Sequence, residues 1–331
     1  MNMPSAHLNR RFVKDHHLPV PVCDPEYIGY YIDLYDEFYD SKRKYTMFLD
    51  LYARLGGDNE NFFVYGADIQ KKALALVKET PAYQNFITDT RDLFSGYKWL
   101  TTNVPKGQVY KGASDGKRFL SIDLVKANFQ ALRYYTREIL KEAPSENDLI
   151  LGANTFEEFI RKFTTEQYYI EAKQFRQVIF GNANPKRQQK IQRYIMDNLL
   201  SFLLNEGFFS VEALKDYTSD EIVFLLDDNT PLQTILDELH KKEQEWHIDL
   251  HLDTYTLRWL RKEGEDVNEK ATKIFAREFD DGKVDFKNVE SSLVPQVCKR
   301  YKGITDINEK DLMFYNSNGL LARYMEPIKW T

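Results

Sequence analysis

The chain has 331 residues, of which 43% are hydrophobic and 14% aromatic, enough for one large domain or two ordinary ones with a packed core. Its net charge of −6 excludes a protein coated in positive charge but does not exclude a local basic groove. Cys23 and Cys298 are the only cysteines, and no apolar run approaches the length of about 18 residues that spans a membrane, so we expect a cytoplasmic protein without disulfides or membrane contact.

The first third of the chain predicts mainly helices. Prolines and basic residues in 1–24 indicate an extended arm, and its start lacks the apolar core of a signal peptide. Over 25–105, apolar residues recur at spacings of three and four, which predicts a helical region. The helices expected there cover 26–55, with a break near Asp40, 67–78 and 82–93.

The next segment, 106–260, mixes strands with helices and is predicted to be the core of the protein. Residues 108–111 and 117–124 flank a turn that contains Gly116, which predicts a β-hairpin. Helical spacing then predicts three helices, over 127–140, 155–180 and 186–204. The last elements expected in this core are a hairpin around Asp220, a helix over 230–245 and a strand over 247–253.

The remaining residues, 261–331, are predicted to form an α+β extension. A hairpin is expected over 279–286, with Gly282 in its turn, and a helix over 292–301. Taken along the whole chain, the order of these elements predicts an α+β fold in which an antiparallel sheet carries helices on one face.

An acidic pair, Asp220 and Glu221, lies between apolar strand-forming residues of the second hairpin. Like charges repel at a tight turn unless a cation or a basic neighbour lies close by, so the pair indicates a function. A third carboxylate, Asp123, ends an earlier apolar strand. Carboxylates at two neighbouring strand ends suit a hard divalent cation such as Mg²⁺, because this ion takes oxygen ligands and keeps several waters.

Basic residues recur at helical spacing between these acidic sites. One helical stripe contains two cations, an amide and an aromatic ring. Such a stripe can hold a triphosphate while the ring supports the base or sugar. Its members are Lys173, Arg176, Gln177 and Phe180. A second basic face follows on the next predicted helix and suits the phosphate backbone of a nucleic acid. Its members are Lys186, Arg187, Lys190 and Arg193.

Three segments, in this order, resemble motifs A, B and C of the DNA polymerase I family (family A) of template-directed polymerases. They are 121–132, 176–181 and 219–224. The resemblance implies a polymerase-type palm sheet in which Asp123 and Asp220 hold two Mg²⁺ ions, or Mn²⁺ in their place, about 3.5–4 Å apart. Glu221 would be an auxiliary carboxylate of the same catalytic site.

The resemblance also implies the reaction. A compact nucleotidyltransferase would add nucleotides from nucleoside triphosphates to the 3′ end of a primed or single-stranded nucleic acid. Lys173 and Arg176 would contact the triphosphate and Phe180 would lie beside the sugar, with Arg176 standing where the family has lysine. Asn128 stands where the family has a glutamate that guards the sugar 2′ position. A small palm without a proofreading domain suits a viral or phage-encoded protein.

Each of these residues also has a purely structural interpretation. Asp220 and Glu221 can be the polar tip of an ordinary hairpin, and Asp123 can cap the helix that follows it. The stripe with Phe180 can be a half-buried helix, and the second basic face can be a solvated surface. A catalytically inactive palm that binds nucleic acid or protein is therefore an alternative, as is an unrelated α+β protein whose acids only coincide with the motifs.

Two further groups of residues leave alternatives open. Four polar residues alternate along one predicted strand, as they would on a wet strand face or, less commonly, in a transition-metal site. They are His247, Asp249, His251 and Asp253. The tyrosines between Tyr27 and Tyr39 recur at helical spacing, which is typical of core residues and less often of a surface that stacks nucleobases.

Overall fold

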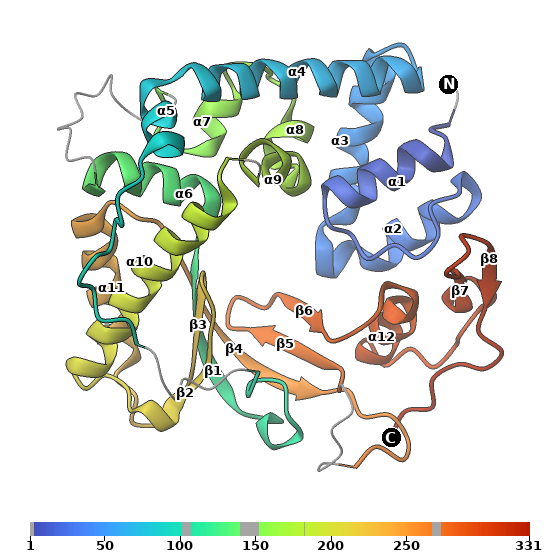
Figure 1. Cartoon of the computed structure of the whole chain (residues 1–331). Helices are drawn as coiled ribbons and strands as arrows, with labels where there is room; N and C mark the ends of the chain where they lie inside the picture. The colour runs from blue at the N-terminus through green and yellow to red at the C-terminus, as the bar shows by residue number, and fades with distance from the viewer. Residues whose placement is uncertain (1–2, 101–106, 140–151, 182, 267–272) are drawn as a thin grey trace.

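The computed structural model describes residues 3–100, 107–139, 152–181, 183–266 and 273–331. The fold is α+β, with an antiparallel six-stranded sheet and helices gathered above and beside it (Figure 1). The strands are β1 (Arg118–Leu124), β2 (Leu214–Tyr217), β3 (Glu221–Leu225), β4 (Leu250–Trp259), β5 (Phe275–Phe279) and β6 (Val284–Lys287). Their order in the sheet is β2-β3-β1-β4-β5-β6.

Strand β1 lies inside the sheet, with β3 on one side and β4 on the other. Because successive side chains of a strand point to opposite sides, β1 has two different faces. Leu120, Ile122 and Leu124 are fully or almost fully buried in the main core. Phe119 belongs instead to a smaller apolar cluster on the opposite face, toward which Asp123 also points by alternation. The sequence thus produces one apolar face for packing and one face that ends in a carboxylate.

The hairpin predicted over 108–124 is not present. Both edges of β1 are already occupied by β3 and β4, so no edge is left to pair with residues 108–111. That segment is not a strand, and the Gln108 amide donates instead to the Lys215 carbonyl oxygen of β2 at 3.2 Å. Val109 is buried in the smaller cluster. The segment therefore covers one face of the sheet rather than extending it.

Helices pack against the other face and beyond it. They include α6 (Ala127–Tyr134), which continues as a π-helical turn over Tyr135–Ile139, α10 (Pro185–Asn205) and α11 (Leu232–Trp246). The end of the helix predicted over 127–140 lies outside the described residues. Helices α6 and α10 contact each other, and Ile191, Ile195 and Leu199 of α10 are buried. The predictions for α10, α11 and the hairpin around Asp220 are confirmed.

The single helix predicted over 155–180 is three short ones. They are α7 (Phe156–Ile160), α8 (Gln167–Glu171) and α9 (Lys173–Gly181). The Thr164 hydroxyl accepts a hydrogen bond from the Glu166 amide at 3.0 Å, which closes a local turn in place of a helical turn. Ala172 is extended, with ψ of 101°, so the chain bends again before α9. Apolar spacing alone does not reveal such interruptions.

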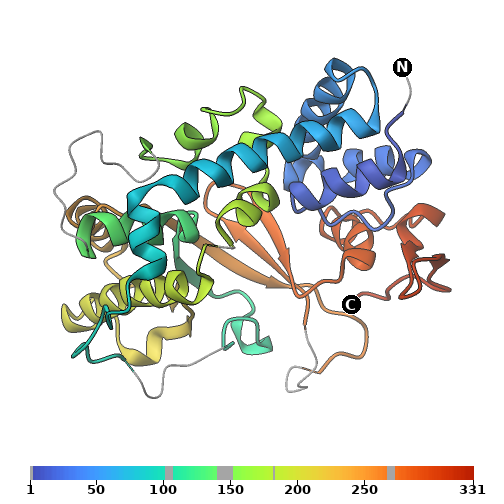
Figure 2. The same ribbon diagram turned by 45° about the horizontal axis from the view of Figure 1, so that its top comes forward.

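The amino-terminal segment predicted as an extended arm contains a helix, α1 (Ala6–Asp15). The Ser5 hydroxyl caps its first turn, and Leu8 and Phe12, one turn apart, are fully buried. The following helices are α2 (Pro25–Tyr39), α3 (Ser41–Arg54), α4 (Asn59–Glu79) and α5 (Pro81–Thr88). Figure 2 shows α4 crossing above the sheet. Within the described residues, no helix has the length and apolarity needed to cross a bilayer.

The carboxyl-terminal residues pack against α2. They contain α12 (Val294–Tyr301) and a small two-stranded sheet of β7 (Met313–Tyr315) and β8 (Leu321–Arg323). The Tyr30 hydroxyl of α2 donates to the Asp311 carboxylate, and the Tyr31 hydroxyl donates to the Lys310 carbonyl oxygen at 2.8 Å. Tyr31 and Tyr35 are fully buried. These tyrosines of α2 are therefore core and anchoring residues rather than a nucleobase-stacking surface.

Candidate functional site

The register of the sheet brings three acidic residues to one end of it. Asp123, next to last in β1, lies directly opposite Glu221, the first residue of β3. The Leu124 amide donates to the Asp220 carbonyl oxygen at 2.8 Å, which places the β2–β3 turn beside the end of β1. Residues about a hundred positions apart in sequence thus become neighbours, as the sequence predicted.

The pKa of Asp123 reflects this crowding. Burial and the nearby negative charges of Glu221 and Asp220 raise its pKa from 3.8 to about 6, while His251 and Lys173 act in the opposite direction. A carboxylate in this position is costly to ionise, and a cation bound beside it would remove the cost. Glu221, opposite Asp123, interacts with it more strongly than Asp220 does.

Hydrogen bonds hold the turn that carries Asp220. The Thr218 hydroxyl donates to Asp220 Oδ1 at 3.0 Å and accepts from the Glu221 amide at 3.0 Å. The Ser121 hydroxyl of β1 donates to Glu221 Oε1 at 2.7 Å. These contacts fix the turn and the Glu221 side chain, so the carboxylates have a defined geometry before any ligand arrives.

The acid set suits an open site rather than a closed metal cage. Among the described residues, no three His, Cys, Asp or Glu side chains are grouped so that they could hold a metal ion by themselves. Mg²⁺ keeps several waters and is commonly bound through one or two carboxylates plus the phosphates of a substrate. Asp123 with one neighbouring carboxylate meets that lower requirement.

Helix α9 carries two cations, of which Lys173 acts on the acidic site. Lys173, the first residue of α9, is exposed, and its charge acts on Asp123. Arg176 is half-buried, with its guanidinium 5.6 Å from the ring centre of Phe156, and burial lowers its pKa although Glu157 opposes this. Neither residue has an ion pair with any residue that the structure describes. An anion between α9 and the acids would therefore meet uncompensated positive charge.

Phe180 and Asn128 are placed differently from the predicted nucleotide contacts. The Phe180 ring is fully buried. It packs against Phe129, Phe156 and Phe159 with ring centres 5.6–5.9 Å apart. In this arrangement it is a core residue that a sugar does not reach. Asn128 of α6 accepts a hydrogen bond from Gln192 of α10 at 3.0 Å, which joins the two helices.

His17 lies beside the two α9 cations, a position that the sequence did not reveal. It follows α1 with a left-handed φ of 51° and is exposed. Its ring forms a hydrogen bond with Gln177 and lies near Lys173 and Arg176; burial and these cations lower its pKa. A histidine in a proline-rich stretch, some 150 residues before α9, carries no local signal of this contact. Only the packing of α1 against α9 creates it.

Most of the basic face predicted on α10 is used within the protein. The Arg187 guanidinium donates to the carbonyl oxygens of Phe86 and Asp89. The other two contacts are an ion pair of Lys190 with Asp92 at 2.6 Å and the stacking of Arg193 over Trp99 at 5.4 Å. Lys186 is exposed. The segment from Phe86 to Trp99 therefore contacts three of the four residues predicted to bind a phosphate backbone, although Lys190 and Arg193 stay exposed.

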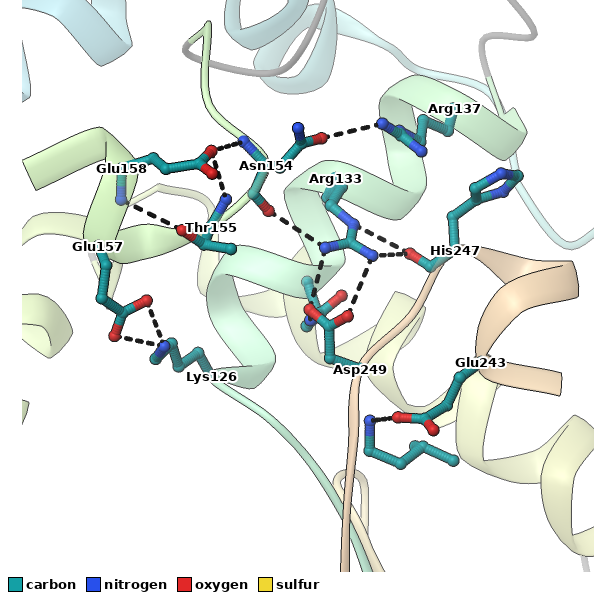
Figure 3. Close-up of polar contacts among 12 residues, drawn as sticks. Lys126, Arg133, Arg137, Asn154, Thr155, Glu157, Glu158, Glu243, His247 and Asp249 are labelled. Atoms are coloured by element: carbon teal, nitrogen blue, oxygen red, sulfur yellow. Dashed lines mark hydrogen bonds and ion pairs between the residues drawn. The ribbon is translucent and has the colours of Figure 1, made fainter. Parts of the chain in front are cut away.

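A second polar cluster, shown in Figure 3, accounts for part of the predicted His–Asp row. Arg133 of α6 donates to the Asp249 carboxylate at 2.9 Å and to the His247 carbonyl oxygen. Strand β4 begins only at Leu250, so His247 and Asp249 precede it and do not alternate with the other two. His251 and Asp253 remain on the strand, paired at 2.9 Å. This cluster joins α6 to the residues just before β4, so Asp249 and His247 have a structural role here.

No protein-family model, no curated protein and no solved structure matches the chain. The function must therefore be inferred from the residues themselves.

Proposed function

We propose that the protein is a compact, metal-dependent nucleotidyltransferase with a polymerase-type palm, which adds nucleotides to the 3′ end of a nucleic acid. The observation that supports the proposal best is the placement of Asp123 opposite Glu221 and beside the Asp220 turn, at the end of an antiparallel sheet. Its raised pKa and the nearby unpaired Lys173 add to this support. Negative and positive charge thus lie side by side, as a metal–triphosphate substrate requires.

In this proposal the acidic residues bind metal and the basic residues bind the triphosphate. Asp123 and Asp220 would hold the Mg²⁺ ions, and Glu221, which accepts a hydrogen bond from Ser121, would tune the field around Asp123 or share an ion with it. When bound, such ions lower the pKa of an attacking 3′-hydroxyl and stabilise the leaving pyrophosphate. Lys173 and Arg176 orient the triphosphate, and the bidentate fork of Arg176 suits a phosphate oxygen pair.

The test is primer extension in Mg²⁺ with a labelled oligonucleotide. We expect the wild type to add nucleotides and Asp220→Ala to fall to the level seen with EDTA, because the variant lacks one carboxylate of the site. Asp281→Ala is the matched control, since Asp281 lies in the turn between β5 and β6 and pairs with Lys283. Equal incorporation by wild type and Asp220→Ala would remove the proposal.

An inactive palm that only binds nucleic acid or protein is the second candidate. The observation that favours it is the burial of Phe180, which leaves the predicted contact to the sugar unmade. This candidate predicts salt-sensitive binding of primed or single-stranded nucleic acid that is unchanged in Asp220→Ala and independent of Mg²⁺. Metal-dependent affinity for nucleoside triphosphates would exclude it.

His17 gives a prediction specific to the cationic side of the site. His17→Gln should raise the KM for nucleoside triphosphate by about five- to tenfold, as expected for loss of one charge-assisted hydrogen bond. Burial and the cations of α9 lower the pKa of free His17, so its protonation, and with it the affinity advantage of the wild type over the variant, should increase as the pH falls.

The measurement is KM for both proteins at several pH values. His240→Gln is the control, because His240 pairs with Glu243 on the distant α11. A ratio of variant to wild-type KM that stays near one at every pH would show that His17 does not contact the triphosphate.

A further inference from the structure

A second cationic site lies at the other end of β1. It is a groove of about 530 Å³ between the segment before β1 and the β2–β3 hairpin. Phe119, Leu214 and Leu225 form apolar parts of its wall, and Lys111, Lys117 and Lys215 contribute its positive charge. A volume of this size is within the range of about 300–1,000 Å³ that ligand sites occupy.

The charge of the groove is poorly compensated. Lys111 and Lys117 are exposed, and neither forms an ion pair with any residue in the described part of the chain. Lys215 Nζ donates to the Glu212 carbonyl oxygen at 2.6 Å, which fixes this lysine at the rim but does not neutralise it. Glu212 is the single carboxylate of the lining. Three ammonium groups around one groove favour a ligand with several negative charges.

The groove and the carboxylates share one face of the sheet. Phe119, Ser121 and Asp123 alternate along the same side of β1, so the groove wall and the acid site are four residues apart. At about 3.3 Å per residue this is about 13 Å. A nucleic-acid strand places one charge about every 3.4 Å along a duplex axis, so about four phosphates span that distance.

Tyr110 packs against the smaller apolar cluster, which contains Phe119 of the groove wall. It precedes Lys111 and packs 6.1 Å from the ring centre of Phe275. Burial raises its pKa to about 12, and Glu221 is among the charges that act on it. On the basic face of α10, by contrast, Arg187 and Lys190 already have partners in the segment from Phe86 to Trp99.

We propose that this groove binds the phosphodiester backbone of the nucleic-acid strand whose 3′ end lies at Asp123. The direction of the strand rests on the proposed function, whereas its binding does not. The recognised chemistry is phosphate, which a free polyphosphate also offers. The apolar walls beside the lysines and the shared sheet face favour the strand, because sugar and base surfaces accompany each phosphate of a polymer.

The experiment measures binding of a labelled oligonucleotide without metal or nucleotide. The double variant Lys111→Gln/Lys117→Gln should weaken binding about tenfold at low salt. It should also reduce the slope of log K against log salt by about 1.4, which is the loss of two contacts to a single strand. The control is Lys42→Gln/Lys72→Gln, which removes two lysines that are paired with Asp33 and Asp68 on α2 and α4. An unchanged affinity and slope in the first variant would overturn the proposal.

A competition arm distinguishes the two sources of phosphate. Tripolyphosphate should displace the oligonucleotide only at high concentration, through general screening, and equally from the wild type and the control variant. Displacement at micromolar tripolyphosphate that is lost in Lys111→Gln/Lys117→Gln would overturn the assignment to a strand. Reduced binding in that variant together with an inactive wild type would leave the groove assigned and remove only the proposed catalysis.

Discussion

Asp123→Asn should abolish nucleotide addition and, in EDTA, raise the stability of the fold. The two effects have one cause. In the metal-free protein the carboxylate is half-buried beside Glu221 and Asp220, and this raises its pKa to about 6. An amide of the same shape carries no charge to desolvate or repel, so the substitution removes a cost in the folded state.

The magnitudes differ widely. A shift of about two units corresponds to about 2.7 kcal/mol, which partial exposure of Asp123 reduces to about 1 kcal/mol. Loss of a metal-binding carboxylate costs several kcal/mol of transition-state stabilisation, or about a thousandfold or more in rate. A gain in stability coupled to a loss of activity is the signature of a site whose charges serve a ligand rather than the fold.

The pH dependence has a fixed sign. The folded-state pKa of about 6 lies above the ordinary value of 3.8, so the folded protein holds the Asp123 proton more tightly. The destabilisation of the wild type is absent below about pH 4, develops between about pH 4 and 6, and is complete above. The stability difference between Asp123→Asn and the wild type should follow the same course.

Thermal unfolding in EDTA measures the gain in stability, and thermal unfolding in Mg²⁺ measures stabilisation by the bound metal. Mg²⁺ should raise the Tm of the wild type and have little effect on Asp123→Asn. Asp281→Asn is the control, because Lys283 lowers the pKa of Asp281 and its loss should slightly destabilise the protein instead. A lower Tm for Asp123→Asn in EDTA would contradict the electrostatic account of the site.

Asp311→Ala should cause the largest loss of stability among single polar substitutions in the carboxyl-terminal region. The Asp311 side chain is fully buried and accepts a hydrogen bond from Lys299 Nζ at 2.6 Å. It also accepts from the Tyr30 hydroxyl of α2 and from the Asn308 amide at 2.8 Å. One carboxylate thus joins three segments of the chain.

Its removal leaves a buried ammonium group without its partner. Breaking a buried ion pair on one side costs about 3–5 kcal/mol, because the remaining charge is neither solvated nor paired. We expect this loss in urea unfolding, together with faster proteolysis after α12. Glu309→Ala is the matched control, since its ion pair with Arg323 is exposed and should contribute less than about 1 kcal/mol. Equal effects of the two substitutions would show that the buried network does not hold the region.

The acidic hairpin could be predicted because its signal is local. Two carboxylates inside an apolar strand pattern identify both the turn and its chemistry. That Asp123 lies near this hairpin was also predicted, since carboxylates at two neighbouring strand ends suit a divalent cation, but the register was not. No local pattern could show that β1 pairs with β3 on one side and β4 on the other. This pairing leaves no edge for the hairpin expected over 108–124.

The remaining errors have physical causes that act over long range or through the backbone. An amphipathic stripe does not tell which of its members faces the core, so Phe180 was assigned to a ligand although three phenylalanines surround it. The prolines of the first segment concealed α1, whose helix depends on burying Leu8 and Phe12. His17 lies beside the α9 cations only through the packing of α1 on α9.

The bond between Tyr30 and Asp311 has a consequence for how the chain is made. The two residues are 281 positions apart. During synthesis, α2 therefore leaves the ribosome long before the carboxyl-terminal residues that pack against it. The Tyr31 hydroxyl can donate to the Lys310 carbonyl oxygen only after those residues have emerged. Contacts of such separation fold slowly and leave apolar surface exposed meanwhile. Nascent chains of this protein should depend on chaperones until nearly the whole sequence has emerged.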